Sequence, residues 1–198
     1  MDLEHVFSKL QNHTPIILGS ENFSKYAVLL PLIHKDNEIH VLFEVRSHQL
    51  RRQPGEICFP GGRIDAMDAD GQSAAIRETN EELGIEKEDI SNVHPLNFLF
   101  SPFGMIVYPY VGYITRPDKI NPNGDEVEET FSVPLTFFIN TKPKIYRVNF
   151  KADPEEDFPI ENYNWRARQI EEYFYHYENR VIWGLTARIL AHFIDFLY

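Results

Sequence analysis

Residues 59–85 read FPGGRIDAMDADGQSAAIRETNEELGI, a Pro-Gly-Gly turn and an Asp-rich loop followed by a carboxylate-rich helical stretch. At about 100° per residue, Glu78, Glu81 and Glu82 fall within one arc of roughly 100° on a helix over 74–83. The opposite side of that helix carries Ala75, Ile76, Thr79 and Leu83. The three carboxylates are therefore predicted to share one helix face.

The residues at the ends of this helix predict where it begins and ends, and the charges on its face suggest a role for it. Asp70 or Ser73 is placed to cap its start, and Gly84 suits the left-handed conformation that ends helices. Glutamates at these spacings repel by about 0.2–0.5 kcal/mol per pair, and Arg77 is the only basic residue between positions 74 and 86. Two explanations stay open on spacing alone: a solvated helix face, or a site for Mg²⁺, which prefers oxygen ligands and substrate phosphates.

The stretch resembles the signature of the Nudix hydrolases, a glycine loop followed by a helix with the pattern Arg-Glu-x-x-Glu-Glu-x-Gly and an apolar residue. The matching positions are Arg77, Glu78, Glu81, Glu82, Gly84 and Ile85. Two features depart from the pattern. Thr79 replaces an aliphatic residue, and the step from Gly62 to Arg77 is one residue longer than usual, with aspartates where a loop glutamate is expected. The resemblance implies Mg²⁺ or Mn²⁺ bound on a diphosphate, and hence metal-assisted hydrolysis.

Roles follow for the individual residues. The predicted metal ligands are Glu78, Glu81, Glu82 and a backbone carbonyl at Gly62, where glycine lets the backbone approach closely. For Arg77, holding the glutamates in place is favoured over contacting the substrate. The general base is either Glu82 or a glutamate of residues 121–135. The candidates of that stretch are Glu126, Glu128 and Glu129, each of which is equally explained as part of a solvated loop end.

The preceding segment, EVRSHQLRRQPGEICFPGG over residues 44–62, is similar to the extended motif of the coenzyme A diphosphatases within that family. Residues 124–135 and 181–190 resemble later stretches of the same subgroup, and so does the longer Asp-rich loop. Coenzyme A carries a diphosphate and a 3′-phosphate, so clustered arginines fit a phosphate clamp, with ordinary surface arginines as the alternative. The predicted substrate contacts are Arg46, Arg51, Arg52 and Gly61.

Composition restricts the function classes. With 19 Lys and Arg against 30 Asp and Glu, the net charge is −11, which argues against nucleic-acid and anionic-membrane binding. The single cysteine, Cys58, excludes an internal disulfide and favours a reducing compartment. The first residues are acidic where a secretory signal would be basic, and no apolar run is long and uncharged enough to span a membrane. We therefore expect a cytoplasmic protein with a small-molecule substrate.

The remaining pattern predicts one domain over residues 1–198. Helices are expected over 3–11 and 183–196, and a helical turn after Pro134. Strands are expected over 26–33, 39–46, 96–100, 105–115, 127–133 and 144–150. The fold class is α/β (α+β), and the resemblance implies the Nudix αβα sandwich, with a mixed β-sheet between helices. Residues 151–163 are expected to form an exposed loop within a subgroup-variable segment, 151–177. The aromatic residues from 160 to 179 suit a packed β-hairpin, with a ligand pocket wall or a homodimer surface as alternatives.

Three functions fit these observations. The first is hydrolysis of coenzyme A or its acyl or oxidised derivatives to 3′,5′-ADP and a 4′-phosphopantetheine product. The second is the same chemistry on another diphosphate, such as ADP-ribose, a dinucleotide or a nucleoside triphosphate. The third is a ligand-sensing module without hydrolysis, which three retained carboxylates on one helix face disfavour.

Overall fold

The computed structural model describes residues 2–11, 13–101, 104–150 and 168–198. The larger of two β-sheets has eight strands in the order β3-β2-β1-β7-β5, with β4, β6 and β8 paired to strands of that path. Its strands are β1 (Ser24–Lys35), β2 (Glu38–Arg46), β3 (Ile57–Cys58), β4 (Gly61–Arg63), β5 (Ile90–Pro95), β6 (Leu99–Ser101), β7 (Met105–Ile114) and β8 (Val127–Pro134).

The smaller sheet has the order β11-β10-β9 and is antiparallel. Its strands are β9 (Lys144–Phe150), β10 (Arg168–Tyr177) and β11 (Arg180–Trp183). The helices are α1 (Leu3–Leu10), α2 (Gly71–Leu83), α3 (Leu135–Asn140) and α4 (Gly184–Asp195), with short 3₁₀ turns η1 (Ser20–Asn22), η2 (Lys87–Asp89) and η3 (Pro117–Lys119).

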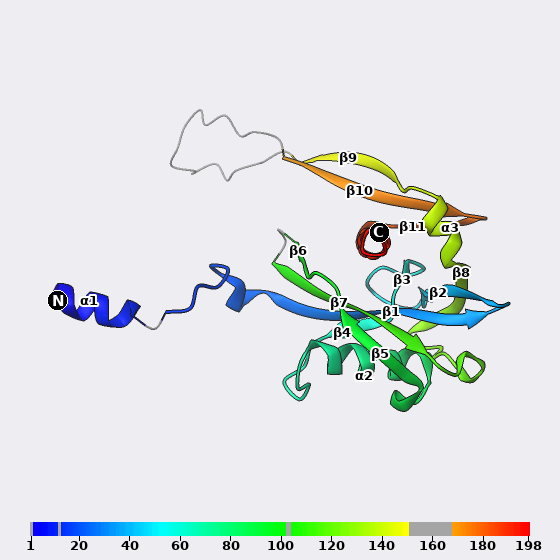
Figure 1. Ribbon diagram of the computed structural model, residues 1–198, viewed down its shortest axis with the longest axis horizontal. Helices are drawn as coiled ribbons and strands as arrows, with labels where there is room; N and C mark the ends of the chain where they lie inside the picture. Colours follow the sequence, from blue (N-terminus) through cyan, green and yellow to red (C-terminus); the bar gives the residue numbers. More distant parts are fainter. Residues whose placement is uncertain (1, 12, 102–103, 151–167) are drawn as a thin grey trace.

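The larger sheet is mixed because β1 and β7 run parallel, with Leu30 opposite Val111, while the other paired strands are antiparallel. Helix α2 covers one face of this sheet, and α4 lies between its other face and the smaller sheet (Figure 1). The predicted fold class, an α+β sandwich with a mixed sheet between helices, is confirmed. The additional layer is the smaller sheet behind α4.

Two hydrophobic cores result from the alternation of side chains along the strands. Consecutive residues of β1 point to opposite faces: Leu29 packs with the α2 core, and Leu30 with the α4 core. Residues of α2 in the first core are Ala74, Ala75 and Leu83. The second core combines the strands with α4 and the smaller sheet through Tyr175, Ile182, Ile189 and Leu190. Both faces of the central strands are therefore buried.

Most predicted elements are confirmed within a few residues, and one is not. The single strand expected over 96–100 is wrong in its bounds, because the chain forms β5 before it and β6 near its end. The pairing of β5 with β7 is irregular between Ser91 and His94, and Asn92 has a positive φ of 51°. Such an irregularity breaks the two-residue alternation by which a strand is recognised in sequence. The loop expected at 151–163, and most of the variable segment 151–177, lie outside the described residues.

The aromatic stretch supports the β-hairpin interpretation where it is described, because β10 and β11 are joined by a tight turn. Helix α4 agrees with the predicted span, and it buries only some of its large apolar residues. Ile189 and Phe193 are buried, while Leu185 is 38% and Phe196 is 63% exposed. The buried residues of α4 are Thr186, Ala187, Ile189, Leu190, Phe193 and Ile194. Helix α4 therefore buries apolar residues where it packs between the two sheets and leaves Leu185 and Phe196 at the surface.

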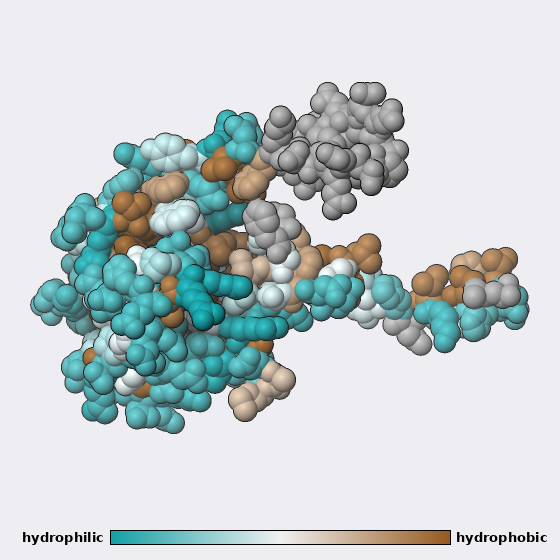
Figure 2. Space-filling view, turned by 180° about the vertical axis from the view of Figure 1, so that it is seen from behind, coloured by the Kyte–Doolittle hydropathy of each residue, from teal (hydrophilic) through white to brown (hydrophobic). Residues whose placement is uncertain are grey.

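The amino-terminal arm, residues 2–22, projects from the body of the molecule (Figure 1). Helix α1 agrees with the predicted helix, its Asp2 side chain accepts a hydrogen bond from the His5 amide, and it buries none of its residues. Apolar side chains lie on the arm in Figure 2, including Leu3, Phe7 and Leu18, which are 72%, 61% and 96% exposed. The helix therefore forms by local capping and propensity without packing on the sheets.

None of the helices in the described part of the chain is long and apolar enough to cross a membrane.

The position of α4 between the sheets predicts a sharp contrast between two leucines of one helix. Leu190 is fully buried and Leu185 is 38% exposed. Leu190→Ala is expected to lower the free energy of unfolding by about 2–5 kcal/mol, because it leaves a cavity in the core. Leu185→Ala, the matched control, is expected to cost less than about 1 kcal/mol. Urea denaturation measures both, and equal losses would contradict the placement of α4.

Candidate active site

The three glutamates of α2 lie at graded depth. Glu82 is only 4% exposed, Glu78 is half-buried and Glu81 is exposed. The helix begins where Asp70 accepts hydrogen bonds from the amide and hydroxyl of Ser73, and Gly84 ends it with a φ of 63°. A solvated helix face therefore describes Glu81 but not Glu82.

The glycine turn brings the backbone against these carboxylates. The Gly61 amide donates to Glu82 Oε2 at 2.8 Å. A Cβ at Gly61 would collide with the backbone of Ala27 and Val28, and a Cβ at Gly62 would collide with the Glu78 carboxylate. Gly61 thus lets β4 approach β1, with which it pairs, and Gly62 leaves room for the Glu78 carboxylate of α2. Both predicted glycines are adjacent to the predicted carboxylates.

Arg77 connects the helix to the Asp-rich loop. Its Nη1 donates to Glu78 at 2.9 Å and to Glu81 at 3.1 Å. Its Nε and Nη2 donate to the two oxygens of Asp68 at 3.0 and 2.9 Å, and Nη2 also reaches the Arg63 carbonyl. The hydrogen bonds from Arg77 lower the pKa of Asp68 to about 2. These contacts fit the favoured role for Arg77, which is to hold the glutamates in place.

Sequence reasoning missed one residue of this cluster, Glu44. It lies on β2, is 1% exposed, and its Oε1 accepts a hydrogen bond from the Cys58 thiol at 3.2 Å. Its Oε2 is buried without a hydrogen-bond partner among the described residues. The available signal was a charged residue inside an apolar run, since both Phe43 and Val45 are buried. Cys58, the only cysteine of the chain, lies half-buried on β3.

Of the later glutamates, the structure brings Glu126 to the cluster. The loop before β8 is tied to α2 because the Asn123 amide donates to the Glu82 carbonyl at 2.9 Å. The same loop is tied to the segment 44–62, which carries Arg46, Arg51 and Arg52, because the Ser47 amide donates to the Glu126 carbonyl at 2.8 Å. The Glu126 charge acts on the side chains of Glu44, Glu78 and Glu82.

The other two candidates from this loop have different surroundings. Glu128 is exposed, and the Glu129 carboxylate accepts two hydrogen bonds from Arg180 at 2.7 and 3.3 Å. Glu126 is therefore the glutamate of residues 121–135 that geometry favours as a site residue.

The electrostatics of the cluster are those of carboxylates removed from water. Burial, and then the charge of Glu44, raise the pKa of Glu82 to about 9. Burial raises the pKa of Glu44 to about 7 against the opposing effects of Cys58 and Arg46. Burial also raises the pKa of Glu78, despite the hydrogen bond from Arg77. Folding alone thus disfavours the ionised forms of these side chains.

A hard divalent cation fits the chemistry of this donor set. The available ligands are carboxylate oxygens, one of them an unpartnered oxygen of Glu44, next to a glycine turn without side chains. Within the described ranges, no three His, Cys, Asp or Glu side chains already converge on one metal position. The reason lies in their present partners, since Glu78 and Glu81 face Arg77 and Glu82 faces the Gly61 amide.

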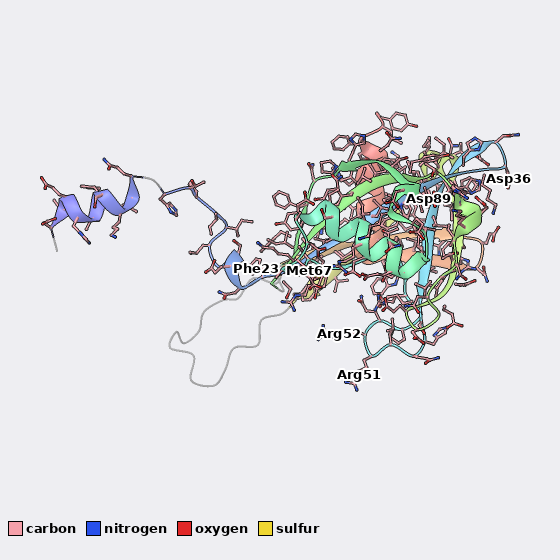
Figure 3. All side chains as sticks on the ribbon, turned by 90° about the horizontal axis from the view of Figure 1, so that it is seen from below. Phe23, Asp36, Arg51, Arg52, Met67 and Asp89 are labelled. Carbon is pink, nitrogen blue, oxygen red and sulfur yellow. The ribbon has the colours of Figure 1, made fainter. Side chains whose placement is uncertain are left out.

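The three predicted arginines do not form one group. Arg46 is half-buried, its Nε is buried without a hydrogen-bond partner among the described residues, and its charge acts on Glu44. Arg51 and Arg52 are exposed on the loop between β2 and β3 and point away from the body of the molecule (Figure 3). Only Arg46 is therefore placed beside the carboxylates.

The raised pKa values predict an unusual pH dependence of stability without metal. A carboxyl group whose pKa is raised on folding stabilises the fold fully below its unfolded pKa, near 4.5, and loses this contribution as the pH rises. For Glu44 and Glu82 the loss extends from about pH 4.5 to about pH 9. In metal-free protein, raising the pH from 6 to 8.5 is expected to lower Tm, by about 2–4 °C for each kcal/mol.

Calorimetry with and without Mg²⁺ checks this expectation. Mg²⁺ should raise Tm more at pH 8.5 than at pH 6, because protons compete with the cation for carboxylate oxygens. Glu82→Gln should flatten the pH dependence and weaken the Mg²⁺ effect, whereas Glu81→Gln, on the exposed side of the helix, should leave the pH dependence in place. A wild-type Tm that is equal at both pH values would contradict the electrostatics described above.

Comparison with known proteins identifies the family. Residues 24–155 match the NUDIX domain. The chain is 32% identical over 167 residues to a peroxisomal coenzyme A diphosphatase, NUDT7, of Mus musculus, covering 84% of this chain and 67% of that protein. It is 42% identical over 119 residues to the peroxisomal coenzyme A diphosphatase ndx-8 of Caenorhabditis elegans, covering 57% of this chain and 50% of that one. This chain thus spans only half the length of the second relative.

A solved structure shows the same fold. The MutT/nudix family protein of Enterococcus faecalis superposes with a TM-score of 0.54 at 16% identity, covering 100% of this chain and 70% of that one. At this identity the likeness concerns the fold alone. The match to the NUDIX domain covers most of the chain and includes the glycine turn, the Arg77 network and the glutamates of α2. The chain is a member of the Nudix hydrolase family.

Proposed function

We propose that this protein is a Mg²⁺- or Mn²⁺-dependent diphosphatase that hydrolyses coenzyme A or its acyl or oxidised derivatives. The observation that carries the proposal is the carboxylate cluster of Glu44, Glu78, Glu82 and Glu126 around the glycine turn, in which three pKa values are raised. Burying such a cluster costs stability, and a bound cation would offset this cost. The names of two relatives, both coenzyme A diphosphatases, support the choice of substrate.

The proposed metal ligands are carboxylate oxygens of Glu78, Glu81 and Glu82 with a backbone carbonyl at Gly62. A divalent cation bound there would neutralise the diphosphate and lower the pKa of a coordinated water. Glu44 adds a fourth carboxylate with a free oxygen. Two of the ligands are also within reach of Arg77, which orients Glu78 and Glu81 by hydrogen bonds of 2.9 and 3.1 Å.

The hydrolysis replaces one P–O bond of the diphosphate with a bond to the oxygen of water, and a proton has to be accepted. Glu82 and Glu126 are the candidate bases. Glu82 is fixed by the Gly61 amide, and burial raises its pKa to about 9, so it would accept the proton only in the ionised form that a bound cation favours. Glu126 lies on an exposed loop next to it. The products are 3′,5′-ADP and 4′-phosphopantetheine or its acyl derivative.

The 3′-phosphate of coenzyme A is the feature that the arginines would recognise. We assign Arg46, beside the carboxylates, to the diphosphate, and Arg51 and Arg52, on the exposed loop, to the more distant phosphate. In a chain of net charge −11, such cations decide where an anionic ligand can bind.

Product analysis tests the reaction directly. Purified protein incubated with coenzyme A and Mg²⁺ should release 3′,5′-ADP, detected by chromatography. Glu82→Gln should lower kcat at least about 100-fold, because it removes a charge from the centre of the cluster. Glu88→Gln, an exposed glutamate outside the cluster, is the matched control and should retain full activity.

The alternatives give different results in the same assay. Cleavage of ADP-ribose or another nucleoside diphosphate, with coenzyme A left intact, would support the diphosphatase activity but exclude coenzyme A as the substrate. Tight ligand binding without turnover at any Mg²⁺ or Mn²⁺ concentration would indicate a sensing module.

Kinetics with dephospho-coenzyme A test the role of the exposed arginines. Arg51→Glu is expected to raise KM for coenzyme A about tenfold, since it exchanges an attractive charge for a repulsive one. The variant should leave KM for dephospho-coenzyme A unchanged, because that substrate lacks the 3′-phosphate. Arg116→Glu, an exposed arginine beside Asp89, serves as the control for charge alone. Equal changes of KM for both substrates would exclude Arg51 from 3′-phosphate recognition.

A further inference from the structure

A cavity of about 410 Å³ lies next to the loop between β2 and β3, on the opposite face of the sheet from α2. This loop carries Arg51 and Arg52 and is called the arginine loop. We propose that the cavity binds the adenine nucleotide half of the substrate, with the base stacked on Trp183 and the phosphates toward the arginine loop. This proposal rests on the proposed function, which supplies a substrate with such a half. The cavity volume is within the range of about 300–1,000 Å³ that small-molecule sites occupy.

Three parts of the fold form the cavity walls. The loop between β2 and β3 contributes His48, Gly55 and Glu56, strand β8 contributes Glu129, and the β10–β11 hairpin contributes Arg180 and Trp183. Strand β3 lies next to β11 (Figure 1). The Thr186 hydroxyl donates to the Ile57 carbonyl at 3.3 Å, which joins α4 to β3. The walls are thus held together by packing and hydrogen bonds between elements distant in sequence.

Trp183 provides a flat surface for a base. The ring of Phe174 lies nearly parallel to it, with centroids 6.0 Å apart and an interplanar angle of 12°. Phe174 therefore supports one face of the indole, yet Trp183 remains 42% exposed. A supported, exposed indole at a cavity wall suits stacking with a nucleobase, which every π face allows.

Polar groups around the indole are already oriented. Arg180 donates two hydrogen bonds to Glu129, and its guanidinium lies 4.0 Å from the centroid of the Phe131 ring. The Glu56 carboxylate accepts a hydrogen bond from Gln53 at 2.9 Å. Carboxylates accept hydrogen bonds from an exocyclic amino group, which adenine carries. The aliphatic pantetheine arm has neither a ring for Trp183 nor a charge for these side chains.

The cavity and the carboxylate cluster lie on opposite faces of the β2–β3 ladder. Val45 and Ile57, which line the cavity, are opposite one another in the β2–β3 ladder. Their chain neighbours Glu44 and Cys58 form the next pair and belong to the cluster on the other face. Adjacent residues of a strand are about 3.4 Å apart along the chain. A ligand that passes the end of this ladder, where the Arg46 amide donates to the Glu56 carbonyl, would therefore have its base in the cavity and its diphosphate at the carboxylates.

The fluorescence of Trp183 tests the proposal without any turnover. The chain has two tryptophans, so Trp165→Phe makes Trp183 the only one. Titration of this variant with 3′,5′-ADP, a compound without a diphosphate bond to cleave, should quench the fluorescence with a saturable curve. 4′-Phosphopantetheine should leave the fluorescence unchanged. Absence of quenching by 3′,5′-ADP, or quenching by 4′-phosphopantetheine instead, would overturn the proposal whether or not coenzyme A is hydrolysed.

Calorimetric titration of variants separates stacking from folding. Trp183→Ala should weaken 3′,5′-ADP binding about tenfold or more, and Trp183→Phe should restore most of the affinity because it keeps an aromatic face. Tyr146→Ala is the control, since Tyr146 is an exposed aromatic of the same small sheet that contacts Phe174 edge-on. Loss of affinity that is equal in Trp183→Ala and Tyr146→Ala would overturn a specific stacking role.

The assay of hydrolysis remains a separate result. If 3′,5′-ADP quenches Trp183 but coenzyme A is not cleaved, the nucleotide site stands and the proposed function is wrong.

Discussion

The close approach of helix α2 to the glycine turn determines the rest of the site. The Glu82 carboxylate reaches the Gly61 amide at 2.8 Å, and the Glu78 carboxylate occupies the space that a side chain at Gly62 would take. A side chain at Gly61 would meet the backbone of β1 at Ala27 and Val28, and a side chain at Gly62 would have to displace the Glu78 carboxylate. The positions of Glu78 and Glu82 relative to the turn therefore depend on these two glycines.

The contact also has an electrostatic consequence. Bringing α2 this close removes Glu82 from water, and the adjoining strand places Glu44 in the same buried region. Arg77 balances the exposed side of the cluster by pairing with Asp68, Glu78 and Glu81, but it does not hydrogen-bond the two deepest carboxylates. The fold thus concentrates buried carboxyl groups whose ionised forms are disfavoured without a partner, which is the arrangement expected of a site that is completed by a cation.

The two faces of the central sheet carry different parts of the proposed site. The face covered by α2 carries the carboxylates, and the face covered by α4 and the small sheet carries the cavity around Trp183. The short strand β3, which lies between β2 and the glycine turn that bonds to β1, has one of its two residues on each face. Because the motif residues 44–62 include this strand and the loop before it, we assign a single segment of sequence to both ends of an extended ligand.

Local sequence was sufficient for the helix α2, its Asp70 and Gly84 ends, the adjoining glycine turn and the long strands β1, β2, β7, β8 and β9, since periodicity, capping and turn residues act over a few positions. It also identified the helix glutamates and pointed to Glu126 among alternatives. Tertiary structure alone decided that Glu82 is buried, that Glu44 joins the cluster and that Arg51 and Arg52 point away from it. These outcomes depend on pairing between residues far apart in the chain, such as Glu44 with Cys58 and Glu129 with Arg180. The burial of a side chain and the shift of its pKa depend on such long-range contacts, so they cannot be read from a local sequence pattern.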